Sequence, residues 1–190
     1  MPRSNVPGLE KYDQRVANLM LDIESTPTGR PYIAWVRKHK PRIDLGKPIT
    51  GGGFTYPWPL DFIVITPVYD DEWLRGAISH ELLHLVKYGG PGTLFGSLEQ
   101  EREATWVSAK VWTEFPPDDL TPPQDRPGYF DKAGWVLDQP PAVVRKIIRD
   151  TWGGFYQSIP ELQPGHWPWQ QLIAGWPQIV YAIRLMLHPE

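Results

Sequence analysis

Apolar residues recur at steps of three and four between Leu9 and Ser25, which is the spacing of one face of an amphipathic helix. The "TPTG" sequence that follows favours a turn and ends this predicted helix. The next apolar run, residues 31–39, fits either a short helix opened by Pro31 or a strand, and we favour the helix.

The pattern changes between residues 41 and 67. Ile43 and Leu45 alternate with polar residues, and three consecutive glycines follow. The compact β-branched run "DFIVIT" then lies between Pro59 and Pro67. Short alternating or β-branched runs separated by glycine and proline are typical of strands and turns. This part of the chain is therefore predicted to form a small sheet.

A long helix is predicted from about Glu72 to Tyr88. Asp70 and Asp71 offer N-caps, and Gly89 and Gly90 end the pattern. Its apolar residues are Leu74, Ile78, Leu82, Leu85 and Val86, and no broad charged face opposes them. A helix of this kind belongs in the middle of a domain.

The rest of the chain is predicted to be mainly helical. One helix follows the possible cap Ser97 and ends at Pro116, and the proline-rich stretch from Pro116 to Gly128 favours an extended loop. Two further helix patterns, "PAVVRKIIRDTW" and "PQIVYAIRLML", fall in a C-terminal subregion, residues 139–190. We expect one α+β domain over residues 1–190.

Composition narrows the function classes. The formal net charge of −3 gives no broad basic field, so we expect no nucleic-acid partner. The chain has no cysteine, so any metal site must use histidine and carboxylate. No run approaches the length of a membrane span, and we expect a soluble, cytoplasmic protein. The oligomeric state stays open.

The predicted central helix carries the sequence "HELLH", from His80 to His84. Helical residues rotate by about 100° each, so the two imidazoles project from adjacent turns and can reach one ion. Glu81 lies at the border of that face, where its carboxylate could hold a water bound to the same metal. Zinc would activate that water, and Glu81 would accept its proton as general base.

A catalytic zinc usually has three protein ligands, and the third must come from elsewhere in the chain. The candidates are Glu99, Glu101 and Glu103 on the following helix. Glu101 shares a helix face with small residues such as Ala104 and Ser108, which would allow close packing against the motif helix. We favour Glu101 for this reason, with Glu103 as the second choice and Glu99 as the third.

The sequences "HELLH" and "EREATWVSA" together resemble the gluzincin metallopeptidases and, more loosely, the ImmA/IrrE-like group. In that pattern the glutamate three residues before an alanine is a zinc ligand, which corresponds to Glu101 before Ala104. Two features differ from the pattern. Thr105 stands where an Asp or Asn commonly supports a zinc-bound histidine, and the interval from His84 to Glu101 is short.

The resemblance implies a zincin-like fold and a zinc-dependent peptidase that holds one Zn²⁺ per chain and acts on a peptide or protein. In gluzincins an edge strand before the motif helix pairs with extended substrate, and "DFIVITPVY" is placed to supply it, although it could equally be a buried core strand. Tyr88, Tyr129 and His166 are candidate oxyanion donors, each more simply explained as structural. The alternative function is a catalytically inactive zincin scaffold that serves in interaction or regulation.

Overall fold

The computed structural model describes residues 3–47, 52–56, 60–89, 96–115, 133–152 and 154–162, with short stretches between residues 169 and 180. It is an α+β arrangement in which helices outweigh a small sheet, which confirms the predicted class. In chain order the elements are α1 (Gln14–Ser25), α2 (Arg30–His39), β1 (Arg42–Leu45), β2 (Gly53–Tyr56), β3 (Phe62–Ile65), α3 (Asp71–Leu83), η1 (His84–Tyr88), α4 (Leu98–Thr113), α5 (Ala133–Asp138), α6 (Pro141–Thr151) and α7 (Gly154–Ser158).

The three strands form a mixed sheet in the order β1-β3-β2. β1 is parallel to β3, and β2 is antiparallel to it. The strand formed by "FIVI" is therefore the centre of the sheet, and the expectation that "DFIVITPVY" supplies an edge strand is wrong. Ile63 and Ile65 are fully buried, because β3 has a neighbour on each side and α3 against one face. β2 is the outer strand that lies nearest the motif helix.

The first helix starts later than its apolar stripe predicts. Asp13 caps α1 by accepting a hydrogen bond from the backbone N–H of Arg15 at 2.9 Å, so the helix begins at Gln14. Leu9 and Tyr12 precede this cap in a turn, yet both are buried. Leu9 and Tyr12 fit the apolar spacing because they pack in the same hydrophobic core as α1, although they lie outside the helix. α2 is helical as predicted, with proline in its first turn.

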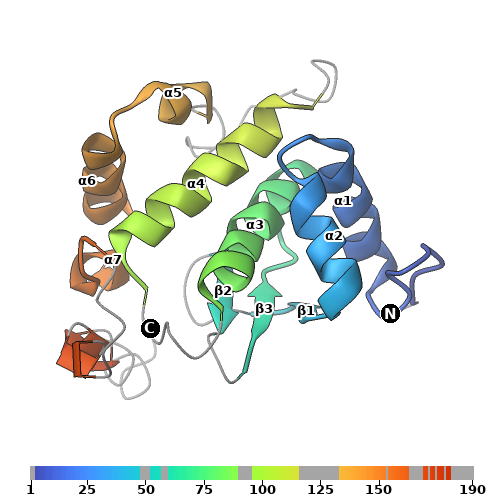
Figure 1. The fold of residues 1–190 in the computed structure, drawn as a ribbon, viewed down its shortest axis with the longest axis horizontal. Coiled ribbons are helices and arrows are strands. Elements are labelled where there is room, and N and C mark those ends of the chain that lie inside the picture. The colour runs from blue at the N-terminus through green and yellow to red at the C-terminus, as the bar shows by residue number, and fades with distance from the viewer. Residues whose placement is uncertain are drawn as a thin grey trace.

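The motif helix α3 is central, as its apolar pattern predicts. Asp70 caps it by accepting from the N–H of Trp73 at 2.9 Å. Every residue from Leu74 to Leu83 is buried except Arg75. In Figure 1, α3 runs between α1 and α2 on one side and α4 on the other, with the sheet below it. The helix does not stay α-helical to Tyr88, because its last turn, η1, is a wider π-helical turn that begins at His84.

Helix α4 separates two hydrophobic clusters. Ala104, Val107 and Val111 face a main cluster built from α1, α2, the sheet and α3. Leu98 and Ala109 face a smaller C-terminal cluster, whose other members are Val136, Val144, Ile148 and Ile159. Ser97 caps α4 as predicted, by accepting from the N–H of Gln100 at 3.2 Å. The C-terminal helices α5, α6 and α7 lie on the far side of α4 from the sheet (Figure 1).

Some predicted segments lie outside the described residues. These are the loop from Pro116 to Gly128 and most of the "PQIVYAIRLML" pattern. Within the part of the chain that the structure describes, no helix combines the length and apolar character needed to cross a membrane.

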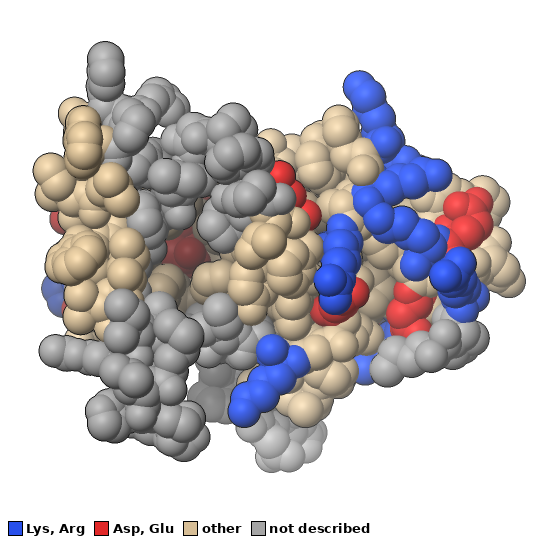
Figure 2. Space-filling model, turned by 90° about the horizontal axis from the view of Figure 1, so that it is seen from below, with Lys and Arg blue, Asp and Glu red and all other residues tan. Residues whose placement is uncertain are grey.

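Lys and Arg side chains gather at the end of the molecule that carries α1 and α2, as seen from below in Figure 2. Lys38, Lys40, Arg42 and Lys47 are exposed there. The formal charge of −3 is therefore unevenly distributed. This basic end lies away from α6 and α7, on the opposite side of α3 (Figure 1).

Candidate metal centre

Three side chains converge where α3 meets the first half of α4. The Nε2 atoms of His80 and His84 are 3.3 Å apart. Oε2 of Glu101 lies 3.1 Å from Nε2 of His80, and Oε1 of Glu101 lies 3.4 Å from Nε2 of His84. Potential ligand atoms of the three residues all lie within 4.8 Å of one another, so they could hold one metal ion. His80 and Glu101 are buried and His84 is nearly so.

The geometry follows from helical spacing and close helix packing. His80 and His84 lie one turn apart, with His84 at the first position of η1. Glu101 lies in the first turn of α4, after the cap Ser97, and Ala104 and Ser108 are fully buried on the same side of that helix. These small residues let α4 approach α3 closely, as the face argument predicts.

The Glu101 carboxylate and the His84 imidazole shift each other's pKa. Burial alone raises the pKa of Glu101, but the charge of His84 and hydrogen bonds from both histidines outweigh it, so that pKa falls well below its usual value. Burial alone lowers the pKa of His84, and the Glu101 carboxylate outweighs burial and raises it. The cluster thus holds a charged carboxylate among imidazoles, a donor set that suits a divalent ion.

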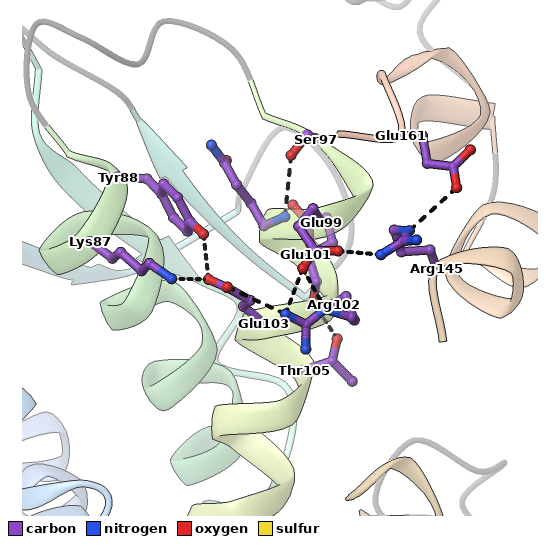
Figure 3. Close-up of polar contacts among 11 residues, drawn as sticks. Lys87, Tyr88, Ser97, Glu99, Glu101, Arg102, Glu103, Thr105, Arg145 and Glu161 are labelled. Carbon is purple, nitrogen blue, oxygen red and sulfur yellow. Dashed lines mark hydrogen bonds and ion pairs between the residues drawn. The ribbon is translucent and has the colours of Figure 1, made fainter. Parts of the chain in front are cut away.

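Glu103, the second choice for third ligand, is not part of this group. Its carboxylate accepts hydrogen bonds from Lys87 and from the hydroxyl of Tyr88, and it pairs with Arg102 at 3.3 Å (Figure 3). Burial alone raises the pKa of Glu103, but the bonds from Lys87 and Tyr88 lower it overall. Glu99 is likewise occupied, because it pairs with Arg102 and Arg145.

Of the candidate oxyanion donors, the structure describes Tyr88, whose ring lies 6.5 Å from the ring of His84. The Tyr88 hydroxyl is committed to Glu103, and burial together with that carboxylate raises its pKa, so it stays neutral. Tyr129 and His166 lie outside the described residues. Thr105 does not support a histidine either, because its hydroxyl donates to the backbone carbonyl of Glu101 at 2.7 Å.

Glu81 follows His80 in the chain but is not part of the candidate metal-binding group. It is buried, and Oε2 of its carboxylate accepts a hydrogen bond from the hydroxyl of Thr55, on β2, at 2.8 Å. A carboxylate that is close to a metal site and held by a separate partner is suited to proton transfer rather than to ligation.

Sequence reasoning missed that aromatic side chains of the C-terminal region pack beside His80 and against β2. The ring of Trp152, at the end of α6, lies 6.0 Å from the ring of His80. Phe155 of α7 contacts Phe54 of β2 edge to face, at 6.4 Å. The only signal in the sequence is the density of aromatic residues between Trp152 and Tyr156, which does not say what they face.

Comparison with protein-family models, with curated proteins and with solved structures gives no match for this chain.

Proposed function

We propose that this chain is a zinc-dependent peptidase in which His80, His84 and Glu101 hold the metal and Glu81 is the general base. The observation that carries the proposal is the convergence of two imidazoles and one carboxylate within 4.8 Å, with a second buried carboxylate beside them. A metal site that served only structure would have no need of a carboxylate at that position.

The donor set fits a catalytic zinc ion. Two histidines and one glutamate leave one coordination position open, whereas structural zinc sites usually have four protein ligands. When bound, one Zn²⁺ per chain would supply a lowered pKa for a coordinated water and polarisation of the peptide carbonyl.

Glu81 does the proton chemistry in this proposal. Its carboxylate accepts a proton as water attacks the peptide carbonyl, and it then donates that proton to the departing amine. The burial of Glu81 supports this role, because proton transfer is more efficient where bulk water does not compete. The ring of Trp152 beside His80 helps to keep the site dry.

Substrate binds in an extended conformation along β2. Among the described residues this strand pairs with β3 on one side only, and it lies beside the motif helix, the place that a zincin-like architecture gives to its edge strand. Backbone pairing to a sheet edge is a common way to hold a peptide without regard to most of its side chains. We therefore assign to "GFTY" the role of the edge strand that pairs with substrate, which the resemblance gave to "DFIVITPVY".

The test of the base is Glu81→Gln. We expect it to bind zinc as the wild type does and to lose about 10²- to 10⁴-fold in the rate of cleaving an unfolded polypeptide such as casein, because the amide cannot accept the proton. Zinc content is measured on the same preparations. A wild-type protein that holds zinc and cleaves nothing would instead support the inactive, regulatory scaffold.

The test of the ligands is a matched pair on one helix. Glu101→Ala is expected to lose zinc affinity by at least about a hundredfold, beyond the usual effect of an outer-shell residue. Glu103→Ala removes a carboxylate two residues away and should retain the metal. If the two variants lose affinity equally, the assignment of Glu101 is wrong.

A further inference from the structure

The outer strand β2 touches the proposed base directly. Oγ1 of Thr55 lies 2.8 Å from Oε2 of Glu81 and 3.0 Å from the backbone carbonyl oxygen of the same residue. A hydroxyl has one proton to donate, so it bonds the ionised carboxylate or the carbonyl at any moment. A hydrogen bond to a charged carboxylate is the stronger of the two.

Gly53 meets the same carboxyl group from two residues earlier in β2. A Cβ atom at this position would lie 2.8 Å from Oε1 of Glu81, closer than Cβ contacts in proteins come, and 3.1 Å from its Cγ, a tight contact, so the carboxyl group would have to move. Residues at i and i+2 share a strand face. Gly53 and Thr55 pair with Ile65 and Ile63 of β3, both fully buried, so this is the face that packs on α3.

We propose that Gly53 and Thr55 form a positioning clamp that sets the orientation of the Glu81 carboxylate. Thr55 holds Oε2, while the bare backbone at Gly53 leaves room for Oε1, which accepts no hydrogen bond from the described residues. Oε1 is then the oxygen that faces the proton to be transferred. This inference rests on the proposed function, because it assigns a task to the base named there.

The clamp has a consequence for how the site is assembled. Glu81 is carried by α3 next to His80, but its carboxylate is oriented by β2, the strand along which the substrate is proposed to lie, whereas Glu101 comes from α4. The orientation of the base relative to the scissile bond is therefore set by the contact between β2 and α3, and it does not require a contact with α4. Preorganisation of this kind determines the rate of the chemical step rather than the affinity for substrate.

The test compares Thr55→Val, which removes only the hydroxyl, with Thr55→Ser, which keeps it. We expect Thr55→Val to lower kcat by about ten- to a hundredfold, the rate equivalent of one hydrogen bond to a charged group, and to leave KM unchanged. Thr55→Ser should recover most of kcat. Thr113→Val is the control, because it removes a hydroxyl bonded to the carbonyl of Lys110 on α4.

Two measurements separate a clamp from a structural role. Zinc content and melting temperature of Thr55→Val should match those of Thr113→Val. In crystal structures prepared with and without zinc, the Glu81 carboxyl should occupy one position in the wild type and several in Thr55→Val, with His80 unmoved. Gly53→Ala should displace the same carboxyl.

The outcomes distinguish this inference from the proposed function. If the wild type cleaves casein and Thr55→Val keeps its kcat and a single Glu81 position, the clamp is overturned and the peptidase stands. If the wild type neither binds zinc nor cleaves, the proposed function fails. The position of the Glu81 carboxyl in the metal-free variants then still supports or overturns the contact between β2 and Glu81.

Discussion

The main hydrophobic cluster and the smaller C-terminal cluster are held together in different ways. The main cluster joins α1, α2, the sheet, α3 and one face of α4 through fully buried side chains such as Leu19, Ile33, Ile63 and Leu82. The C-terminal cluster has few such residues, and ion pairs supplement it. Arg145 of α6 pairs with Glu99 of α4 and with Glu161 (Figure 3).

The difference matters because the candidate metal centre draws on both regions. Its three proposed ligands lie on α3, η1 and α4, beside the main cluster, while Trp152 reaches it from the C-terminal region. Ligand geometry should therefore depend on the main cluster, and enclosure of the site on the C-terminal helices. The following predictions test this division.

The largest effect is expected from two cavity-creating substitutions at equally buried positions, one in each cluster. Leu82 in the main cluster is fully buried and Ile148 in the C-terminal cluster is 1% exposed. We expect Leu82→Ala to lower the free energy of unfolding by about 3–5 kcal/mol and Ile148→Ala by about 2–3 kcal/mol, because a sparser cluster collapses more easily around a cavity. Urea unfolding measures both values.

Zinc binding should distinguish the same two variants more sharply than stability does. Leu82→Ala loosens α3, which carries His80 and continues into η1 at His84, so its zinc affinity should fall. Ile148→Ala should keep wild-type affinity at temperatures where it remains folded. Equal loss of zinc from both variants would show that the two clusters act as one unit.

Metal removal should have the next largest effect and should be confined to the main cluster. Zinc at about a hundred times its dissociation constant stabilises the folded state by about 2.7 kcal/mol. Treatment with a chelator should therefore lower the melting temperature and speed hydrogen exchange in α3 and α4, with little change in α6. Glu101→Ala, which lacks a proposed ligand, should show no such difference between the two conditions.

The smallest effect is expected from the ion pairs that attach α6. Arg145→Met keeps the apolar stem and removes the guanidinium, which should cost about 1–2 kcal/mol because Glu99 is left without one of its partners. Lys146→Met is the control, since Lys146 is 75% exposed and its pair with Asp150 should contribute little. Equal effects in the two variants would mean that Arg145 does not hold α6 to α4.

Acid should abolish the difference between Arg145→Met and the wild type. Burial alone raises the pKa of Glu99, but the bonds from Arg102 and Arg145 lower it below 4.5 in the folded state. A carboxyl whose folded pKa is lowered contributes stability above its unfolded pKa and loses that contribution as the pH falls through the folded value. The difference in unfolding free energy between Arg145→Met and the wild type should be full at pH 7 and should shrink below about pH 4.5. Unfolding at several pH values would measure it.

Local patterns were enough to predict much of this fold. The N-caps Asp70 and Ser97, the proline at the start of α2 and the apolar pattern of α3 act over a few residues, so they could be read from the sequence. Glu101 was favoured for a similar reason, because the small residues on its helix face describe a close approach between neighbouring helices.

Features that depend on distant partners could not be predicted in this way. Strand order follows from pairing between segments, and nothing in "DFIVIT" itself says that β1 and β2 flank it on both sides. Thr55 and Glu81 meet across 26 residues of chain. Trp152 reaches His80 only because α6 packs on α4. In each case the partner, and not the local pattern, decides the outcome.

The π-helical turn η1 shifts the helical phase of the chain directly after the second histidine. Its hydrogen bonds span five residues instead of four, which is equivalent to inserting about one residue into an α-helix. His80 and His84 keep their ordinary spacing, while Lys87 and Tyr88 are rotated toward Glu103 on α4. One extra residue in the helical count thus lets a single stretch of chain present the two candidate metal ligands in one phase and an anchor to the neighbouring helix in another.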